Sequence, residues 1–318
     1  MRGLKLATLI HRVASIIPTP TSGYRGRLAP SPTGYLHVGH ARTFFAAWLR
    51  ACDAGGALVM RMEDLDPNRS LAEYAEAALE DLHWLGIRWH EGPDIGGPFA
   101  PYAQSLRHAF YLAAWRRLLR GGFIYPCRCS RKDLAAALSA PHESAHRRPD
   151  PLDDERIYPG TCRPLQGTGP HMPRPAGLEL DDPSGTNWRF RVPDREAVEF
   201  NDLNLGPQRF VAGVDFGDFV VWRRDGVPSY QLACVADDEA MRITEVVRGA
   251  DLLKSTARQI LLNRALGFDS PAWFHCRLVT DDKGHRLAKR HDALSLRTLR
   301  QRGMTPMNIL SGELPVEA

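Results

Sequence analysis

The segment RLAPSPTGYLHVGHAR, residues 27–42, decides how this chain folds. A short apolar stretch leads into a turn rich in Pro, Ser and Gly. Apolar residues then recur at helical spacing as far as Leu49. The pattern predicts a strand, a tight turn and a helix. Gly34 and Gly39 have no Cβ, so the backbone and the helix end can lie close to a bulky ligand.

Two histidines stand at the start of this predicted helix. His37 and His40 are three residues apart, so they share one face and point toward the N-terminus. That end carries unsatisfied N–H groups and partial positive charge, which favour a bound anion. The pair is therefore a candidate polyphosphate site; the alternative is a helix start with two ordinary surface histidines.

The composition is typical of a globular protein of two or three domains. The chain has 318 residues, 43% hydrophobic and 25% charged, and its net charge of +4 permits a polyanionic partner without requiring one. Six scattered cysteines do not resemble a disulfide framework. No apolar run approaches the ~20 residues of a membrane span. We therefore expect a cytoplasmic monomer with reduced thiols and no membrane association.

Residues 1–23 are basic, free of acidic residues and mildly amphipathic. His11 and Arg12 interrupt their one apolar run, which argues against a secretory signal. A transit peptide, a disordered tail and a start placed too far upstream remain open, and we expect a disordered extension.

Residues 24–124 alternate between strand and helix patterns, as in a parallel α/β domain. The predicted strands and helices are strands 24–29 and 57–62 and helices 42–51, 71–85 and 105–120. In open α/β sheets ligands bind at the carboxyl ends of the strands. Glu63 falls at such an end and is a candidate to bind the α-ammonium group of an amino acid; the alternative is a capping or surface acid.

Three cysteines form a candidate metal site. Cys127 and Cys129 stand where the α/β pattern breaks, and Cys162 follows a polar stretch that we predict to be a surface loop. A CxC on a turn and one further thiolate supply three ligands of a tetrahedral zinc site. The alternative is three buried free thiols. His142 and His146 are candidates for a fourth ligand.

The second half of the predicted sheet begins near Asp218. The remaining predicted strands and helices are strands 188–192, 198–201, 211–214, 218–222 and 243–247 and helices 131–138 and 255–266. Arg248 follows a strand, where a planar guanidinium can hold a carboxylate with two N–H groups. Tyr230, in an apolar helix, is a candidate hydrogen-bond donor to a substrate or, alternatively, a core residue.

Four motifs in order resemble the class I aminoacyl-tRNA synthetases, in the form of the glutamyl branch. Residues 27–42 resemble the HIGH-type signature, and RMEDLDPNR (61–69) resembles the RIEDTD segment. GVPSYQLACVADD (226–238) resembles the GxPTYxLAxVVDD block. RLAKR (286–290) stands in the place of KMSKS, with Arg286 for Lys and Ala288 for Ser. Without this context a basic loop is more often a solvated turn. The resemblance covers about residues 24–312.

The resemblance implies a role for each matching residue. Glutamate would be bound by Arg27, Ala29, Ser31, Glu63, Tyr230 and Arg248. ATP, accompanied by Mg²⁺, would be bound by His37, Gly39, His40, Arg286, Leu287 and Lys289. The implied catalytic residues, which stabilise phosphoryl charge, are His37, His40 and Lys289. The family pairs a CxC with YxxxC, so one zinc ion would be held by Cys127, Cys129, Tyr158 and Cys162.

Within the family the chain resembles the glutamyl-Q tRNA(Asp) synthetases, which are shortened relatives of glutamyl-tRNA synthetase. Few residues follow Arg290, and we expect no anticodon-binding domain or other basic RNA module there. The resemblance implies two steps. L-glutamate and ATP give glutamyl-adenylate without tRNA, and the glutamate is then transferred to queuosine at the wobble position of tRNA(Asp).

We therefore predict an α/β fold with a Rossmann-like parallel sheet, an inserted zinc-binding acceptor-type domain and a short helical C-terminal part. The predicted division is an extension (1–23), two halves of the catalytic domain (24–124 and 211–266), the zinc-containing insertion (125–210) and the KMSKS-type loop with a helical end (267–318). The alternatives are a truncated enzyme that charges tRNA(Glu), a non-catalytic zinc-containing RNA-binding paralogue, and a generic nucleotidyltransferase.

Overall fold

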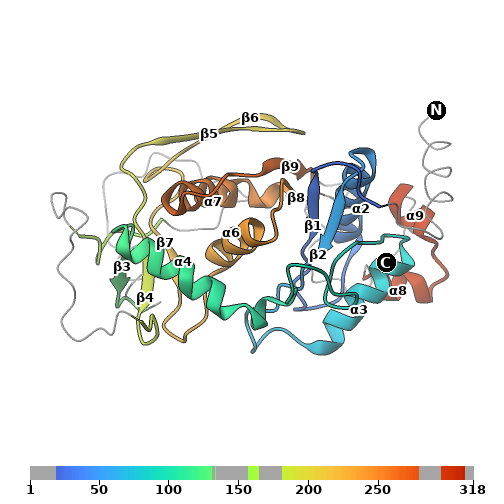
Figure 1. Ribbon diagram of the computed structural model, residues 1–318, viewed down its shortest axis with the longest axis horizontal. Helices are drawn as coiled ribbons and strands as arrows, with labels where there is room; N and C mark the ends of the chain where they lie inside the picture. Colours follow the sequence, from blue (N-terminus) through green and yellow to red (C-terminus); the bar gives the residue numbers. More distant parts are fainter. Residues whose placement is uncertain (1–18, 131–132, 134–156, 165–180, 279–294, 312–318) are drawn as a thin grey trace.

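The computed structural model of the protein describes residues 19–130, 133, 157–164, 181–278 and 295–311. These ranges form an α/β fold with a parallel sheet, and five strands follow one another between its two halves (Figure 1). The helix predicted at 131–138 and the RLAKR motif lie outside the described residues, apart from Asp133. None of the helices in the described ranges has the length and apolarity that crossing a membrane requires.

The parallel sheet is formed by two pairs of strands. β1 (Arg25–Leu28) pairs with β2 (Ala57–Met60), and β8 (Glu245–Gly249) pairs with β9 (Ala272–Cys276). The pairs adjoin between β1 and β8, where the Thr244 N–H donates to the Arg25 carbonyl oxygen over 2.9 Å. Most residues of β1, β2 and β8 are buried, as expected for parallel strands covered by helices.

Helices cover this sheet and connect its strands. α2 (Val38–Asp53) links β1 to β2, and α7 (Leu253–Leu266) links β8 to β9. α7 ends at Gly267 in the left-handed region (φ +63°), which glycine adopts without a Cβ clash. The other helices and short 3₁₀ turns that surround the site are α3 (Ala72–Trp84), η1 (Gln104–Leu106), α4 (His108–Arg120), α6 (Tyr230–Ala240) and η2 (Ala250–Leu252).

A second, antiparallel sheet lies at the left end of the long axis (Figure 1). It consists of β3 (Ile124–Cys127), β4 (Asn187–Phe190) and β7 (Phe219–Trp222), with β4 in the middle. The hairpin of β5 (Ala197–Asp202) and β6 (Gly206–Val211) reaches along the top of the view. It joins the parallel sheet where Asp202 pairs with Trp273 of β9.

Buried apolar residues form two clusters. One lies among α4, α6, α7 and the antiparallel sheet, around Trp115 and Trp222. The other joins α2, β1 and β2 to the helices α8 (Leu296–Gln301) and α9 (Pro306–Ser311). The described residues after the RLAKR motif, 295–311, therefore pack against the first half of the sheet.

Three predictions of local structure were inaccurate. The helix expected from residue 42 begins at Val38, because the preceding histidine caps it. The strand expected at 211–214 is wrong: β6 ends at Val211, and Gly213 (φ +79°) turns the chain there. The strand expected at 218–222, β7, pairs with β4 and not with the parallel sheet, which is joined by β5.

Candidate active site

The N-terminus of α2 is capped by the ring of His37. Its backbone is extended (φ −121°, ψ 174°), and the Gly39 N–H donates to Nδ1 of His37 over 3.1 Å. The His37 N–H in turn donates to Nδ1 of His40 over 3.3 Å. A Cβ at position 39 would lie 3.0 Å from the His37 ring, so any larger residue would have to displace the capping ring. Because both Nδ1 atoms accept, the proton of each ring in its neutral form is on Nε2.

A cavity of about 850 Å³ opens at this end of α2. All predicted glutamate- and ATP-binding residues within the described ranges line it, namely Arg27, Ala29, Ser31, His37, Gly39, His40, Glu63, Tyr230 and Arg248. The other predicted ATP-binding residues, Arg286, Leu287 and Lys289, lie outside the described ranges. Residues that the sequence did not single out also line the cavity, among them Tyr35, Tyr74, Asp251 and Arg297.

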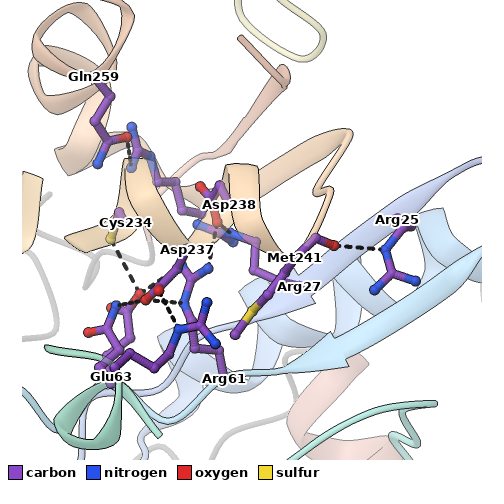
Figure 2. Close-up of polar contacts among 12 residues, drawn as sticks. Arg25, Arg27, Arg61, Glu63, Cys234, Asp237, Asp238, Met241 and Gln259 are labelled. Atoms are coloured by element: carbon purple, nitrogen blue, oxygen red, sulfur yellow. Dashed lines mark hydrogen bonds and ion pairs between the residues drawn. The ribbon is translucent and has the colours of Figure 1, made fainter. Parts of the chain in front are cut away.

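A cluster of buried charges, Arg61, Glu63, Asp237 and Asp238, lies at one wall of the cavity (Figure 2). Arg61 Nη1 donates to Asp238 over 2.6 Å, and Nη2 donates to Glu63 over 3.0 Å. Its Nε lies 3.9 Å from Asp237. Burial alone would lower the pKa of Arg61, but the three carboxylates raise it well above its usual value. We call these four residues the charge cluster.

Asp237 anchors the charge cluster to the surrounding helices. It accepts hydrogen bonds from Arg107 Nε (2.5 Å), Gln104 Nε2 (2.8 Å) and the Tyr111 hydroxyl (2.9 Å). Burial and the Asp237 charge raise the pKa of Tyr111, so its hydroxyl remains a donor. Asp237 therefore has a structural role in the charge cluster. Residues of η1 and α4 hold its carboxylate, and it does not line the cavity.

Glu63 is the member of the charge cluster that lines the cavity. Its Oε1 accepts from Arg61 and from the Cys234 thiol, whose sulfur lies 3.4 Å away. Burial raises the pKa of Cys234 well above its usual value, so the thiol keeps its proton. Both hydrogen bonds made by described residues end on Oε1, which leaves Oε2 to accept from an ammonium group.

Arg248 is buried too, but its partners are all neutral. Nε lies 3.2 Å from His275 Nε2, and Nη2 donates to Thr256 over 2.7 Å. Nη1 donates to Gln259 over 2.9 Å and to the Tyr230 hydroxyl over 3.4 Å. No carboxylate of the described residues lies within 4.0 Å of this guanidinium. A buried charge of this kind is stabilised by a ligand of opposite charge.

Tyr230 and Arg27 complete the wall around Arg248. Tyr230 begins α6, whose N-cap Ser229 accepts from the Leu232 N–H over 3.4 Å. Burial raises the pKa of Tyr230, so its hydroxyl is neutral. The hydroxyl oxygen accepts from Arg248, and its O–H can donate to a ligand. Arg27 Nη1 donates to a backbone carbonyl, while its buried Nε has no hydrogen-bond partner among the described residues.

The predicted metal ligands lie together at the antiparallel sheet. The sulfurs of Cys127, Cys129 and Cys162 are all within 4.8 Å of one another, and the last two are 3.5 Å apart. The Tyr158 hydroxyl lies 3.5 Å from Cys127 Sγ and 3.8 Å from Cys129 Sγ. Ligand distances of about 2.3 Å for sulfur and about 2.0 Å for oxygen give tetrahedral edges of about 3.5–3.8 Å. The four residues therefore fit one zinc ion; His142 and His146 lie outside the described residues.

Arg189 of β4 lies against this cysteine cluster. Its guanidinium stacks 3.8 Å from the centre of the Tyr158 ring, and its Nε lies 3.3 Å from Cys127 Sγ. Burial raises the pKa of Cys129 to about 11 and also raises that of Tyr158. A metal ion reverses this effect by stabilising thiolate and phenolate, and a fixed guanidinium acts in the same direction.

The sequence analysis missed the residues that do not line the cavity but form hydrogen bonds with the residues that do. Arg61 and Asp238 stand inside two of the quoted motifs, so a signal was present. Thr256, Gln259 and His275 gave none, because their contacts arise only when α7 packs against β9.

Comparison with known proteins gave consistent matches. The family model described as the catalytic domain of class I tRNA synthetases (E and Q) matches residues 24–161 and 175–314. The glutamyl-Q tRNA(Asp) synthetase of Symbiobacterium thermophilum is 49% identical over 285 residues, which cover 90% of this chain and 84% of that protein. The protein of the same name from Nitratidesulfovibrio vulgaris is 45% identical and is covered over 87% of its length.

Longer proteins match as well. Glutamate–tRNA ligase 2 of Acidithiobacillus ferrooxidans is 44% identical over 89% of this chain but 56% of its own length. The crystal structure of a glutamate tRNA ligase from Elizabethkingia meningosepticum, in complex with its amino acid, superimposes with a TM-score of 0.69 at 28% identity. The match covers 89% of this chain and 54% of that one. The chain thus spans about half the length of the glutamate–tRNA ligases it matches.

Proposed function

The chain belongs to the class I tRNA synthetases of the E and Q type, and within them to the glutamyl-Q tRNA(Asp) synthetases, and from this premise we propose its reaction. It activates L-glutamate with ATP, in the absence of tRNA, to glutamyl-adenylate. It then transfers the glutamyl group to queuosine at the wobble position of tRNA(Asp).

The observation that carries the first step is the environment of Arg248. A buried guanidinium held by neutral groups faces a cavity, so a carboxylate in the cavity gains a charge-assisted interaction that an amide does not. The side-chain carboxylate of glutamate binds Arg248, and the α-ammonium group binds Glu63. This arrangement selects glutamate over glutamine.

In the activation step one α-carboxylate oxygen of glutamate attacks the α-phosphorus of ATP. A bond forms between them, the bond to the bridging oxygen breaks, and pyrophosphate leaves with the electron pair. The Nε2–H groups of His37 and His40 donate to the phosphates at the N-terminus of α2. Lys289 neutralises the leaving pyrophosphate, and Mg²⁺ accompanies ATP. Catalysis comes from positioning and electrostatics, since no side-chain nucleophile takes part.

In the transfer step a nucleophilic group of queuosine forms a bond to the carbonyl carbon of the adenylate and gives up its proton. The bond between that carbon and the phosphate oxygen breaks, and AMP leaves with the electron pair. Support for this acceptor comes from the relatives named glutamyl-Q tRNA(Asp) synthetase, of which the chain covers 84% and 87%. The second candidate is charging of tRNA(Glu), which is favoured by the 44% identity to a glutamate–tRNA ligase.

The test is transfer of radiolabelled glutamate, with ATP, to matched tRNA(Asp) preparations with and without queuosine. We expect label only on the tRNA that carries queuosine. Label on tRNA(Glu) instead would make the protein a charging enzyme. Glutamate-dependent exchange of pyrophosphate into ATP, measured without tRNA, tests the activation step separately. Exchange that requires tRNA would contradict the proposed first step.

We also propose that the cysteine cluster holds one structural zinc ion, bound by Cys127, Cys129, Tyr158 and Cys162. The ion would fix the described segment around Tyr158 and Cys162 against the end of β3. Elemental analysis is expected to give one zinc per chain in the wild type and none in Cys127→Ser. Wild-type protein purified without chelator and free of zinc would refute the assignment.

A further inference from the structure

We propose that His275 and Asp202 form a positioning dyad that orients Arg248 for recognition of the substrate carboxylate. The inference rests on the proposed function, because it concerns the residue that selects glutamate. Neither member lines the cavity, so the dyad acts on the substrate only through Arg248.

The contacts of the dyad form a buried chain. Asp202 Oδ2 lies 2.6 Å from His275 Nδ1, and His275 Nε2 lies 3.2 Å from Arg248 Nε. Asp202 and His275 are 1% and 0% exposed, so water does not compete with these bonds. The His275 ring thus bridges the end of β5 to the arginine at the cavity wall.

The hydrogen-bond pattern fixes the tautomer of His275. Arg248 Nε–H can only donate, so Nε2 of the ring must accept and must lack a proton. The proton therefore sits on Nδ1, where the carboxylate of Asp202 accepts it. A carboxylate at Nδ1 is a known way to hold an imidazole in one tautomer and orientation.

His275 must also be neutral for this arrangement. Burial, together with the adjacent Arg248, lowers the pKa of His275 to about 4, although Asp202 acts in the opposite direction. The other groups that face the ring are Thr256, whose Oγ1 lies 3.0 Å from Nε2, and the charge of Arg27. An imidazolium here would repel Arg248 and would lose the acceptor on Nε2.

Asp202 is itself rigidly held, which makes it a suitable anchor. Its Oδ1 accepts from the backbone N–H groups of Asn204 (3.0 Å) and Leu205 (2.8 Å), and its Oδ2 accepts from the His275 N–H (3.1 Å). The hydrogen bond from the His275 ring, together with these backbone bonds, holds the pKa of Asp202 below its usual range despite burial. The anchor sits where β5 joins β9, so the β5–β6 hairpin is connected to the glutamate pocket.

The consequence for Arg248 is a fixed guanidinium plane. Thr256 and Gln259 hold the two terminal nitrogens, and His275 holds Nε, which restrains rotation about the Cδ–Nε bond. Two-pronged recognition of a carboxylate depends on this plane. A misplacement of about 1 Å at such a contact can lower the rate by about 10²-fold.

Two substitutions at position 275 separate the two faces of the ring. His275→Gln keeps an acceptor near Nε2, facing Arg248, whereas His275→Asn keeps a polar group near Nδ1, facing Asp202. Asp202→Asn presents a donor to Nδ1 and favours the wrong tautomer. His90→Gln is the matched control, because His90 accepts from the Leu58 N–H and does not line the cavity.

The measurement is glutamate-dependent pyrophosphate exchange, with thermal unfolding of each variant. We expect His275→Asn and Asp202→Asn to raise KM for glutamate by about 10- to 100-fold and to leave KM for ATP unchanged. His275→Gln, which keeps the acceptor toward Arg248 but loses the bond to Asp202, should raise KM for glutamate less than His275→Asn, and His90→Gln should stay near the wild type. A wild-type KM for glutamate in His275→Asn, or equal increases in the Gln and Asn variants, would overturn the proposal.

Nitrogen NMR of histidine-labelled wild-type protein tests the dyad without reference to activity. We expect one buried ring, absent from the His275→Gln spectrum, to be neutral with its proton on Nδ1 down to about pH 5. A proton on Nε2 would refute the dyad even if exchange is normal. Absence of exchange in a wild type with the Nδ1 tautomer would refute the proposed function instead.

Discussion

Two arginines at the same cavity are buried in opposite ways. Arg61 sits in the charge cluster, with carboxylates on every side of its guanidinium. Arg248 sits between α6, α7 and β9. Its hydrogen bonds among the described residues go only to hydroxyl, amide and imidazole groups, and its guanidinium lies 5.0 Å from the centre of the Trp273 ring. Arg61 has its counter-ions inside the protein, whereas none of the described residues supplies a counter-ion to Arg248.

The difference separates scaffold from recognition. A paired buried charge contributes to a fixed arrangement of strands and helices, because removing one partner leaves the others unpaired. A buried charge whose hydrogen-bond partners are neutral can still interact strongly with a ligand of opposite charge. Burial alone therefore does not identify a binding arginine; the chemistry of its partners does.

The largest effect is expected from Arg61→Met. The substitution leaves Glu63, Asp237 and Asp238 without their shared cation in a buried site. Breaking a buried pair in this way typically lowers the free energy of unfolding by about 3–5 kcal/mol. Urea unfolding followed by circular dichroism measures the change. A variant as stable as the wild type would show that the charge cluster is not a structural element.

Arg248→Ala is expected to affect catalysis more than stability. Loss of a buried charged hydrogen-bond partner at a ligand typically weakens the interaction by about 2–5 kcal/mol. Pyrophosphate exchange with glutamate should therefore fall by at least about 30-fold, while the urea midpoint changes less than in Arg61→Met. Arg248→Lys should not restore exchange, because an ammonium lacks the planar fork. Unchanged exchange in Arg248→Ala would contradict the pocket assignment.

The contrast between the two arginines also marks what sequence can reveal. Arg248 is recognisable because it stands near the carboxyl end of an apolar strand, β8, in a known context, and its neighbour Tyr230 stands in a quoted motif. Arg61 stands in a motif as well, but the sequence does not tell that Asp237 and Asp238, more than 170 residues away, surround it. Arg61 is enclosed only once α6, which carries both aspartates, packs against it.

The fold was predictable for a different reason. The patterns of apolar strands and amphipathic helices are visible in short stretches of sequence. The predicted bounds of β1, β2, α3 and α7 therefore lie within a few residues of the observed ones. The failure at 211–214 arose because apolar Val211 and Val214 flank Gly213, and the periodicity does not show that this glycine turns. Which strand joins which sheet, as for β7, depends on long-range pairing and was missed.

A smaller effect is expected from pH, through His275. Its pKa is about 4 in the folded protein and about 6.5 in the unfolded chain, so the unfolded state binds the proton more tightly between these values. Stability should be full above about pH 6.5 and should fall by at most about 3 kcal/mol toward pH 4. In the folded protein burial and the charges of Arg248 and Arg27 lower the pKa of His275, whereas the charge of Asp202 raises it.

The measurement is urea unfolding of wild type and His275→Gln from pH 7 to pH 4. Asp81, whose pKa burial raises to about 6, titrates in the same window with the opposite sign, so the difference between the two proteins is compared. We expect a steeper decline in the wild type. Parallel curves would show that His275 is not held neutral beside Arg248.

The smallest effect is expected from Arg209→Ala, in the hairpin that also carries Asp202. Arg209 Nε lies 3.2 Å from Glu199 Oε1, but the two side chains are 62% and 67% exposed. Water screens such a pair, so neither the urea midpoint nor KM for glutamate should change. The result isolates the anchor at the end of β5 from the hairpin as a whole. An increase in KM for glutamate here, equal to that in Asp202→Asn, would mean that any disturbance of the hairpin reaches Arg248 and that the dyad has no special role.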